Sequence, residues 1–471
     1  MTDAKNGHQT WTTTRRTALR VGAVAAAATT GLGTAGKALA STVSSDYDVI
    51  VVGAGFTGVT AARELIARGH RVLILEARDR IGGRIHTGLM GGTLIEYGGT
   101  WIHPNQHNIW STVEDLGVPL LTDETPSHTV FPAEGGGHEE FTLEEGLGRQ
   151  IELLHTYLEG VESAFPDPDD PFAAPPEIEA LDQRSIQDRL DALGLSELDE
   201  AWLNTYTAGQ GGTTDRGGFS QIAQWWALSD FDADTFYALN ATRPRDGLTD
   251  VLQRMVDAMD VDLTLNAPVD NITETNDGVE VVTRDGYAYN ASAAVIAVPV
   301  NVWNTIDYGR PLPAEFHQAA EDGYSVPGVK KFLVNLAGDL RRPMVNAGPN
   351  HLFTFLVPMD TTDEGVLMAG FSTYPEFDTT DHDRIAAAIK EILPDAEVIE
   401  IDGHDWGADP QAQGGWTYKQ PGQLSEEVRV LRQRQGPLAF ATSDISTGWS
   451  GYVDGAMESG AHAAREILDF L

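Results

Sequence analysis

Residues 46–77 read DYDVIVVGAGFTGVTAARELIARGHRVLILEA, and this stretch decides the fold. A continuous apolar run covers 49–52, apolar residues recur at helical spacing over 59–66, and a second apolar run covers 72–75. Continuous apolar runs are typical of buried parallel strands, and the spacing between them is typical of an amphipathic helix. A strand–helix–strand unit of this length predicts the opening of a doubly wound α/β domain.

Three glycines mark the turn between the first predicted strand and the helix. Gly53, Gly55 and Gly58 have the G-x-G-x-x-G spacing. In that motif the first glycine permits the turn, the second lets the backbone approach a pyrophosphate, and the third lets helix and strand pack closely. The start of the helix offers unpaired N–H groups and a partial positive charge to phosphates. Glu76 ends the second strand, where a carboxylate accepts hydrogen bonds from ribose hydroxyls. Together these features indicate a dinucleotide site rather than a glycine turn of purely structural use.

The composition limits the class of protein. The chain of 471 residues has 70 acidic and 31 basic residues and a net charge of −39, and it is long enough for two domains with cores of their own. The negative charge argues against nucleic acid or an anionic membrane as a partner. We interpret it as an aid to solubility in preference to a docking face for a cationic protein. The absence of cysteine excludes disulfides, thiolate catalysis, cysteine-ligated metal and a cysteinyl cofactor link. We predict no metal site.

The first 40 residues are predicted to be a twin-arginine export signal. Arg15 and Arg16 precede an apolar, Ala/Gly-rich run, and Ala38-Leu39-Ala40 form a small-x-small cleavage site. The run is too weakly apolar for a membrane anchor. Because the twin-arginine machinery carries folded proteins, we expect a periplasmic or extracellular protein that is exported with its cofactor bound.

Two segments, the first of which begins at Glu76, resemble a known family. EARDRIGGRIHT at 76–87 contains a second glycine pair followed by Arg84, and EYGGTWIHP follows at 96–104. Together they resemble the flavin-dependent amine oxidase (monoamine oxidase) family, and the resemblance extends over 46–471. It implies a Rossmann-type, p-hydroxybenzoate-hydroxylase-like FAD domain interleaved with an α+β substrate domain. The FAD domain is expected at 46–100, 240–300 and 425–471, and the substrate domain at 101–239 and 301–424.

The resemblance also implies which residues bind FAD. In the family, Arg84 and the glycines line the pyrophosphate, Gly98 to Thr100 run beside the isoalloxazine, and the backbone of Val269 meets the adenine. The segment GWSGYVDGA at 448–456 packs under the flavin and aims the start of the next helix at the pyrimidine edge, where reduction places negative charge. Asp444 stands in place of the usual glutamate as a ribitol or phosphate contact. The predicted set is Gly53, Gly55, Phe56, Thr57, Gly58, Glu76, Ala77, Arg78, Gly83, Arg84, Gly98, Gly99, Thr100, Trp101, Val269, Ser443, Asp444, Tyr452 and Val453.

Three further residues match the substrate side of that family. Trp416 and Tyr452 correspond to two aromatic rings that form a cage in front of the flavin and orient an amine between their faces. The alternative is that both are ordinary core aromatics. Lys330 corresponds to the lysine that holds a water near flavin N5. In VKKFLVNL, at 329–336, Lys330 is in phase with three apolar residues, which predicts that it points inward. The alternative is that Lys331 is the functional lysine and Lys330 is solvated.

The implied reaction is oxidation of an amine carbon–nitrogen bond by hydride transfer to flavin N5. The imine hydrolyses to an aldehyde or ketone, and oxygen is reduced to hydrogen peroxide. Gly415 stands where some members carry the cysteine that attaches FAD, which implies a noncovalent cofactor. Trp101 stands where amino-acid oxidases carry an arginine for the substrate carboxylate, which disfavours α-amino acids. HDWGADPQAQGGW at 404–416 and QPGQLS at 420–425 look most like bacterial nicotine-type amine oxidoreductases.

Three other functions stay open on the sequence. An amine dehydrogenase would pass electrons to a periplasmic carrier such as a cytochrome, with the acidic surface as its docking site. A non-catalytic flavin- or amine-binding protein would keep the fold without the chemistry, although the matches at Lys330, Trp416 and Tyr452 argue against it. An NAD-dependent dehydrogenase would use the same glycine-rich turn.

Overall fold

The computed structural model describes residues 47–471 apart from 327, 338–341, 363–364 and 375. These residues lie in one compact unit, Val43–Leu471. The predicted export signal at 1–40 lies outside the described residues, and the division into an FAD domain and a substrate domain stays a prediction. None of the described helices has the length and apolar content needed to cross a membrane.

The stretch at 46–77 supplies the centre of a five-stranded parallel sheet. Its strands are β1 (Val49–Val52), β2 (Val72–Leu75), β9 (Asp262–Thr264), β13 (Ala293–Ile296) and β19 (Leu438–Phe440), in the order β19-β13-β1-β2-β9. All four residues of β1 are buried, and alternate residues belong to two different hydrophobic clusters. A parallel strand covered on both faces has this pattern. The predicted doubly wound α/β class is confirmed.

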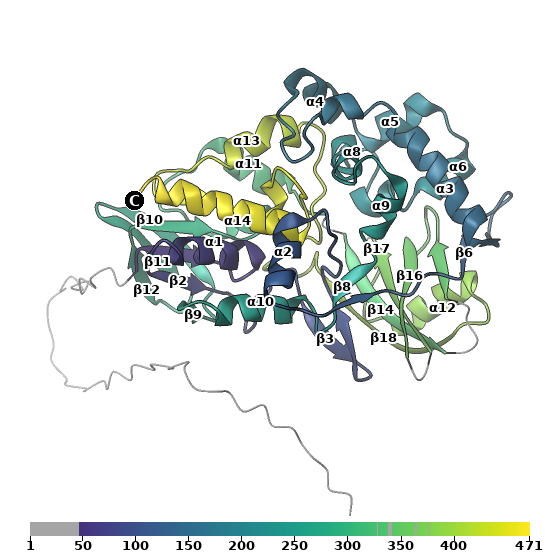
Figure 1. Cartoon of the computed structure of the whole chain (residues 1–471), viewed down its shortest axis with the longest axis horizontal. Coiled ribbons are helices and arrows are strands. Elements are labelled where there is room, and N and C mark those ends of the chain that lie inside the picture. Colours follow the sequence, from purple (N-terminus) through teal and green to yellow (C-terminus); the bar gives the residue numbers. More distant parts are fainter. Residues whose placement is uncertain (1–46, 327, 338–341, 363–364, 375) are drawn as a thin grey trace, which may run out of the picture. The chain divides into compact units, whose positions relative to one another are not determined.

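Helices α1 (Phe56–Ile66) and α14 (Val453–Leu468) pack side by side next to this sheet, although they come from distant parts of the sequence (Figure 1). Gly460 permits the close approach, because a Cβ atom at this position would lie 2.2 Å from the carbonyl oxygen of Thr57. The two ends of the described chain are thereby joined into one layer of the fold.

A second, antiparallel sheet contains β10 (Val269–Thr275), β11 (Gly278–Thr283) and β12 (Ala288–Ala291). Its hairpins turn at Asn276-Asp277 and around Asp285-Gly286, where residues that favour tight turns interrupt the alternating apolar pattern. Val269, at the start of β10, is buried.

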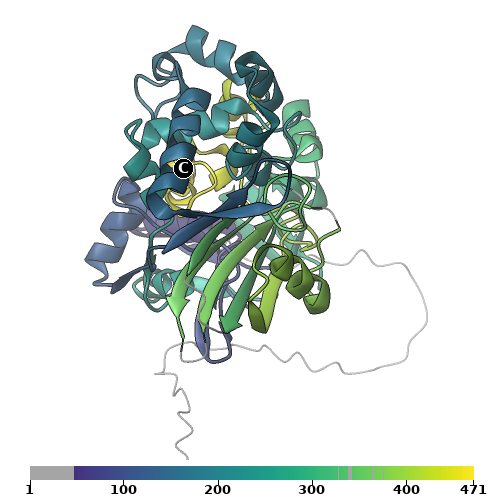
Figure 2. The same cartoon turned by 90° about the vertical axis from the view of Figure 1, so that its right-hand side faces the viewer.

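A seven-stranded mixed sheet has strands in the order β18-β14-β17-β16-β15-β6-β7. The strands are β6 (His128–Pro132), β7 (His138–Thr142), β14 (Lys330–Ala337), β15 (Pro343–Asn346), β16 (Phe355–Thr361), β17 (Val366–Ser372) and β18 (Glu397–Asp405). On one face, α12 (His382–Ile392) lies against the sheet (Figure 2), and Phe332 of β14 belongs to the same hydrophobic cluster as Ile385 and Ile389 of this helix. On the other, Leu333 packs with the hairpin of β3 (Thr87–Met90) and β4 (Thr93–Glu96). Both faces of β14 are therefore buried.

Helices make up most of the chain between β7 and β8 (Thr242–Pro244). They are α3 (Leu143–Leu158), α4 (Pro175–Asp182), α5 (Ile186–Leu193), α6 (Glu197–Leu203), α7 (Ala208–Gly211), α8 (Phe219–Leu228) and α9 (Ala233–Ala238). The other elements are α2 (His107–Asp115), β5 (Leu120–Thr122), η1 (Glu162–Ala164), β8 (Thr242–Pro244), α10 (Leu248–Asp257), η2 (Val300–Thr305), α11 (Ala314–Asp322), η3 (Gln423–Glu427), α13 (Val428–Leu431) and η4 (Ser443–Ile445). Helices α3 and α5 begin at complete capping boxes, which pair their first N–H groups with side chains.

Candidate active site

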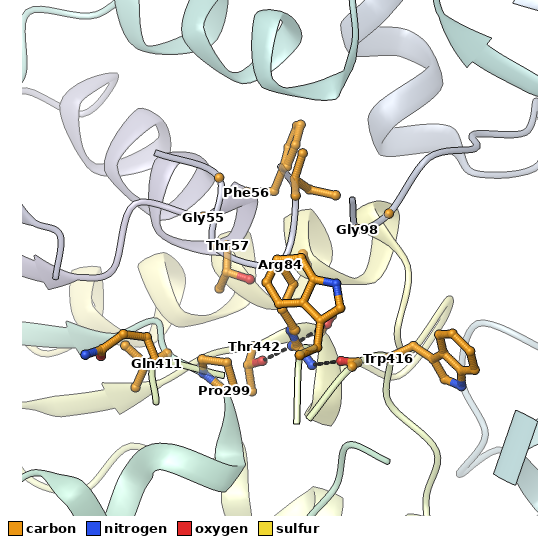
Figure 3. Close-up of a pocket in the computed structure, with 18 of the residues that line it drawn as sticks. Gly55, Phe56, Thr57, Arg84, Gly98, Pro299, Gln411, Trp416 and Thr442 are labelled. Carbon is orange, nitrogen blue, oxygen red and sulfur yellow. Dashed lines mark hydrogen bonds between the residues drawn. The ribbon is translucent and has the colours of Figure 1, made fainter. Parts of the chain in front are cut away.

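A cavity beside the turn after β1 gathers residues from both ends of the described chain (Figure 3). The predicted cofactor residues that line it are Gly53, Gly55, Phe56, Thr57, Glu76, Ala77, Arg78, Gly83, Arg84, Gly98, Gly99, Thr100, Trp101, Val269, Ser443, Tyr452 and Val453. The predicted cage residue Trp416 lines the same cavity as Tyr452. Three predicted site residues, Gly58, Asp444 and Lys330, are not part of the lining.

Gly58 serves the cofactor turn from behind. A Cβ atom at this position would lie 2.0 Å from the carbonyl oxygen of Gly53 and 3.1 Å from a methyl carbon of Val51. The third glycine of the motif thus lets α1 sit directly on β1, which is the packing role that its spacing predicts. Gly58 therefore supports the cofactor turn through packing and does not itself line the cavity.

Asp444 is fully buried and holds Arg84 rather than lining the cavity. Its Oδ1 lies 2.8 Å from a guanidinium nitrogen of Arg84, and its Oδ2 accepts from the backbone N–H of Val300 at 3.0 Å. Burial alone would raise the pKa of the Asp444 carboxyl, but the charge of Arg84 and the hydrogen bonds, including one from Thr417, hold it below its usual value. The predicted direct contact with ribitol or phosphate is therefore replaced by an indirect role through Arg84.

Arg84 is fixed from several sides at the centre of the cavity (Figure 3). It donates to Ser325 Oγ at 2.8 Å, to the Gly415 carbonyl at 3.0 Å, and to Thr442 Oγ1 and Ser443 Oγ at 3.3 and 3.2 Å. A guanidinium held in one orientation is suited to planar anionic or carbonyl groups. Figure 3 places Gln411 and Trp416 on opposite sides of it.

The backbone around the cavity has the features that a dinucleotide requires. Gly53 has a φ of +107°, and a Cβ atom there would lie 2.7 Å from the carbonyl oxygen of Ala297. A Cβ atom at Gly98 would lie 1.9 Å from the carbonyl oxygen of Arg84. Helices α1 and α14 both begin at the cavity, and neither has a side chain that caps its first N–H groups. Open helix N-termini are suited to phosphate and to a negatively charged ring edge, so the residues present fit FAD.

A loop over residues 405–415 covers part of this cavity. Asp409 pairs with Arg78 at 2.7 Å, and the indole N–H of Trp406 donates to the carbonyl of Tyr97 at 2.9 Å. Trp406 and Gln411 also line the cavity. Strand β18 of the seven-stranded sheet leads directly into this loop. The pair of Asp409 with Arg78, which follows β2, therefore links the seven-stranded sheet to the parallel sheet.

The two cage residues are each supported by other aromatic rings. Trp416 donates its indole N–H to the carbonyl of Gln210 at 2.9 Å, and its ring centroid is 5.6 Å from that of Phe371. The ring centroid of Tyr452 lies 5.4 Å from that of Trp225 and 5.5 Å from that of Trp449. Edge-to-face contacts of this kind restrict the rings to one orientation.

The lysine that reaches the cavity is Lys331, not Lys330. The ammonium of Lys331 donates to the Gly98 carbonyl at 3.0 Å and to the hydroxyl of Thr100, and Lys331 lines the cavity. Lys330 donates to the carbonyl of Tyr374 at 3.3 Å. The periodicity argument failed because both faces of β14 are buried: the face shared with Phe332 meets α12, whereas the other meets the cavity.

Lys331 lies in a buried group of charges. Burial lowers its pKa, and the carboxylates of Glu96 and Asp123 act in the opposite direction. Burial raises the pKa of Glu96, although Leu248 N–H and Thr87 Oγ1 donate to its carboxylate at 2.7 and 2.9 Å. Because Glu96 and Lys331 interact electrostatically, the loss of a proton by one of them depends on the charge of the other.

Asp123 connects this group to the cavity wall. Burial raises its pKa, while hydrogen bonds from Trp101 Nε1 at 2.6 Å and Arg243 Nε at 2.5 Å lower it. The ring of Trp101 lies 5.4 Å from the ammonium of Lys331. Asp123 therefore orients the indole that stands beside the lysine.

Much of the remaining wall could not be predicted from the sequence. Lys331 is predicted there only as the alternative to Lys330. The wall residues without a prediction include Trp406, Gln411, Gln210, Trp225, Asn240, Val298, Pro299, Val302, Thr305, Ile306, Phe355, Val357, Phe371 and Thr442. They come from several separate elements, and no fixed spacing links them. Val298 and Pro299, which follow β13, could have been predicted. A loop that follows a parallel strand at this edge of the sheet often contacts a ligand.

The fold and the cavity define a flavoenzyme of the amine oxidoreductase class. The family model described as flavin containing amine oxidoreductase matches residues 56–468, and the chain belongs to this family. The resemblance seen in the sequence is thereby confirmed.

The names of individual relatives refer to different amines. The chain is 31% identical to pseudooxynicotine dehydrogenase of a Pseudomonas species, over 90% of this chain and 87% of that protein. It is also 31% identical to nicotine dehydrogenase of Pseudomonas putida, over 97% of each. Among solved structures, it is similar to wild-type putrescine oxidase bound to putrescine, with 25% identity and a TM-score of 0.76, over 90% of this chain and 99% of that one.

Proposed function

We propose that this flavoenzyme is an exported FAD-dependent amine oxidase that oxidises an amine carbon–nitrogen bond and uses oxygen as the acceptor. The observation that carries the proposal is that Lys331, Trp416 and Tyr452 line the same cavity as the glycine-rich cofactor turn. When bound, FAD supplies the acceptor for a hydride equivalent. The imine product would hydrolyse to an aldehyde or ketone, and hydrogen peroxide would be the second product.

The roles of the three residues follow from their placement. Trp416 and Tyr452 offer aromatic faces to an amine, which orients its α-carbon and limits access of water. Lys331 is anchored to Gly98 and Thr100, so its ammonium stays at one point of the wall and can hold a water there. Its lowered pKa makes it suited to giving up or taking a proton near neutral pH.

We further propose that FAD is held without a covalent bond. The chain has no cysteine, and Gly415 occupies the position where covalent relatives of the resembled family attach the flavin. A Cβ atom at Gly415 would lie 2.6 Å from a methyl carbon of Val329, so a side chain there would collide with the wall. Acid precipitation should release all of the flavin into the supernatant.

The direct test is an anaerobic screen of primary, secondary and heterocyclic amines, in which loss of the yellow absorbance reports flavin reduction. The neighbouring lysines give a matched pair of variants. Lys331→Met should slow flavin turnover about a hundredfold and retain the cofactor, whereas Lys330→Met should behave as wild type. Equal rates for Lys331→Met and wild type would remove Lys331 from the mechanism, and failure of every amine to reduce the flavin would favour a non-catalytic binding protein.

A second candidate is an amine dehydrogenase that passes electrons to a carrier protein. Two observations favour it: two relatives are named dehydrogenases, and the net charge of −39 suits a cationic carrier such as a cytochrome. Measuring hydrogen peroxide per amine consumed, with and without added cytochrome c, separates the two. One peroxide per amine supports the oxidase, while slow reoxidation in air that cytochrome c accelerates supports the dehydrogenase.

Export through the twin-arginine machinery is part of the proposal. It rests on Arg15, Arg16 and the Ala38-Leu39-Ala40 site. Replacing both arginines by lysine should leave active, flavin-loaded protein inside the cell, as measured by fractionation. Unchanged export of the lysine variant would contradict this route.

A further inference from the structure

The substrate side of the cavity continues into a small recess of about 40 Å³. Gln210, Trp225, Asn240 and Tyr452 line both spaces. The rest of the recess is formed by Tyr206, Ile222, Phe236, Tyr237 and Leu239. A space of this size holds a small substituent or ordered water rather than a second ring.

No carboxylate of the described part of the chain lines the substrate side of the cavity or the recess. Among the described residues that line the cavity and the recess, Glu76 is the one acidic residue. It lies at the nucleotide turn, and its oxygens accept from the N–H groups of Ala54 and Arg78 at 2.8 and 2.9 Å. A second ammonium group on a substrate would therefore be taken out of water without a counter-charge, which is strongly unfavourable.

The polar residues that line the recess are uncharged. Gln210 and Asn240 carry side-chain amides, which both donate and accept hydrogen bonds. Tyr237 donates to Gln150 Oε1 at 2.7 Å, and its ring centroid lies 6.0 Å from that of Tyr206. Burial raises the pKa of both tyrosines, so their hydroxyls stay neutral.

The rest of the substrate side is a set of flat apolar surfaces. Phe355 and Phe371 stack with an interplanar angle of 23° and a centroid distance of 4.7 Å, and Trp101 stands 6.3 Å from Phe371. These rings, with Trp416 and Tyr452, favour a flat apolar body.

We infer that the preferred substrates are monoamines with a flat apolar body and an uncharged hydrogen-bonding group at the far end, and that diamines are excluded. The inference rests on the proposed amine oxidation and specifies its substrate class. The solved relative bound to putrescine, a diamine, provides the natural contrast.

Three amines that differ at a single position test the inference on the flavin-loaded protein. 4-Methylbenzylamine, 4-methoxybenzylamine and 4-(aminomethyl)benzylamine share one ring and carry an apolar, a neutral polar and a second cationic group. Anaerobic flavin reduction should be at least as efficient with the methoxy compound as with the methyl compound, and about a hundredfold less efficient with the diamine. A diamine within threefold of the methyl compound overturns the inference.

Binding measured by the shift of the flavin spectrum keeps this result separate from the proposed function. If none of the amines reduces the flavin but the methoxy compound binds and the diamine does not, the oxidation is wrong and the specificity stands. If the diamine binds as tightly as the methoxy compound, the specificity is wrong whatever the reaction.

A charge placed at the recess provides the reverse test. Gln210→Glu should raise the efficiency ratio of the diamine to the methyl compound at least tenfold. Gln253→Glu adds the same charge on the outer side of α10, where Gln253 pairs with Asp257 at 2.9 Å, and should leave the ratio unchanged. A flavin-loaded Gln210→Glu variant with the wild-type ratio contradicts the assignment of this wall.

Discussion

The two halves of the cavity are walled by different parts of the chain. Along the nucleotide half, the wall is largely backbone: the turn at Gly53, the pair at Gly98-Gly99 and the uncapped start of α14. Along the substrate half, the wall consists of side chains from separate elements, such as Gln210 and Phe371. A backbone wall is fixed by the fold, whereas a side-chain wall can be altered by single substitutions.

This difference predicts what mutations will do in each half. Changes that disturb the nucleotide half should cost stability and cofactor binding, because the same groups hold the sheet and helices together. Changes in the substrate half should alter rates and specificity and leave the fold intact.

The largest effect is expected for Arg84→Met in the nucleotide half. The substitution leaves the carboxylate of Asp444 buried without an ion partner, and it should lower the free energy of unfolding by about 3 kcal/mol and weaken FAD binding. Urea unfolding and FAD titration measure the two effects. Adding Asp444→Asn should restore most of the stability, and a single variant as stable as wild type would show that Arg84 does not support this half.

Lys419 does not line the cavity, and it tests the packing between α8 and the segment before α14 through pH. It is buried, it donates to Ser450 Oγ and Gln221 Oε1, and burial lowers its pKa to about 7, against the opposing charges of Asp182 and Asp444. The unfolded chain therefore binds more protons above pH 7, so this lysine makes stability rise with pH up to its unfolded pKa. Between pH 7.5 and 9 wild type should gain up to about 2 kcal/mol relative to Lys419→Met. Parallel pH profiles of unfolding for wild type and Lys419→Met would refute the lowered pKa of Lys419.

Trp416→Ala probes the substrate half. The loss of one aromatic face should reduce kcat/KM for a good amine tenfold to a hundredfold, roughly 1.4–2.7 kcal/mol, while the flavin stays bound and the unfolding midpoint hardly moves. Trp416→Phe keeps a face and should recover most of the activity. If turnover were unchanged in the alanine variant, the indole would belong to the core and not to the reaction.

The smallest effect is expected where the 405–415 loop joins the two halves. Asp409→Asn weakens the contact with Arg78 and should speed FAD release about fivefold, about 1 kcal/mol. The surface pair of Asp250 with Arg254 has the same 2.7 Å distance, so Asp250→Asn is the matched control and should leave FAD release unchanged. Equal release from both variants would mean that the loop does not retain the cofactor.

The same contrast explains how much the sequence could predict. The parallel sheet and the cofactor turn could be predicted because glycine spacing and apolar runs directly report backbone geometry. The place of α14 at the cofactor followed from the family resemblance instead. The choice of Lys330 over Lys331 was wrong because period-2 reasoning identifies an inward face only when the other face meets water. Gln210 and Asn240 could not be found, since tertiary structure alone brings their elements together. Asp444 was correctly predicted to lie near the cofactor site. Its contact with Arg84 could not be predicted, because the two residues are far apart in sequence and only the fold brings them together.

The contact of Gly460 with Thr57 has a consequence for biosynthesis. During translation the glycine-rich turn is synthesised long before α14, the helix that completes its far side. A nascent chain that lacks α14 therefore has no finished place for a cofactor, and loading must wait until this helix has been made. Frameshifts or cleavage before α14 would then yield colourless protein although the glycine-rich turn is present.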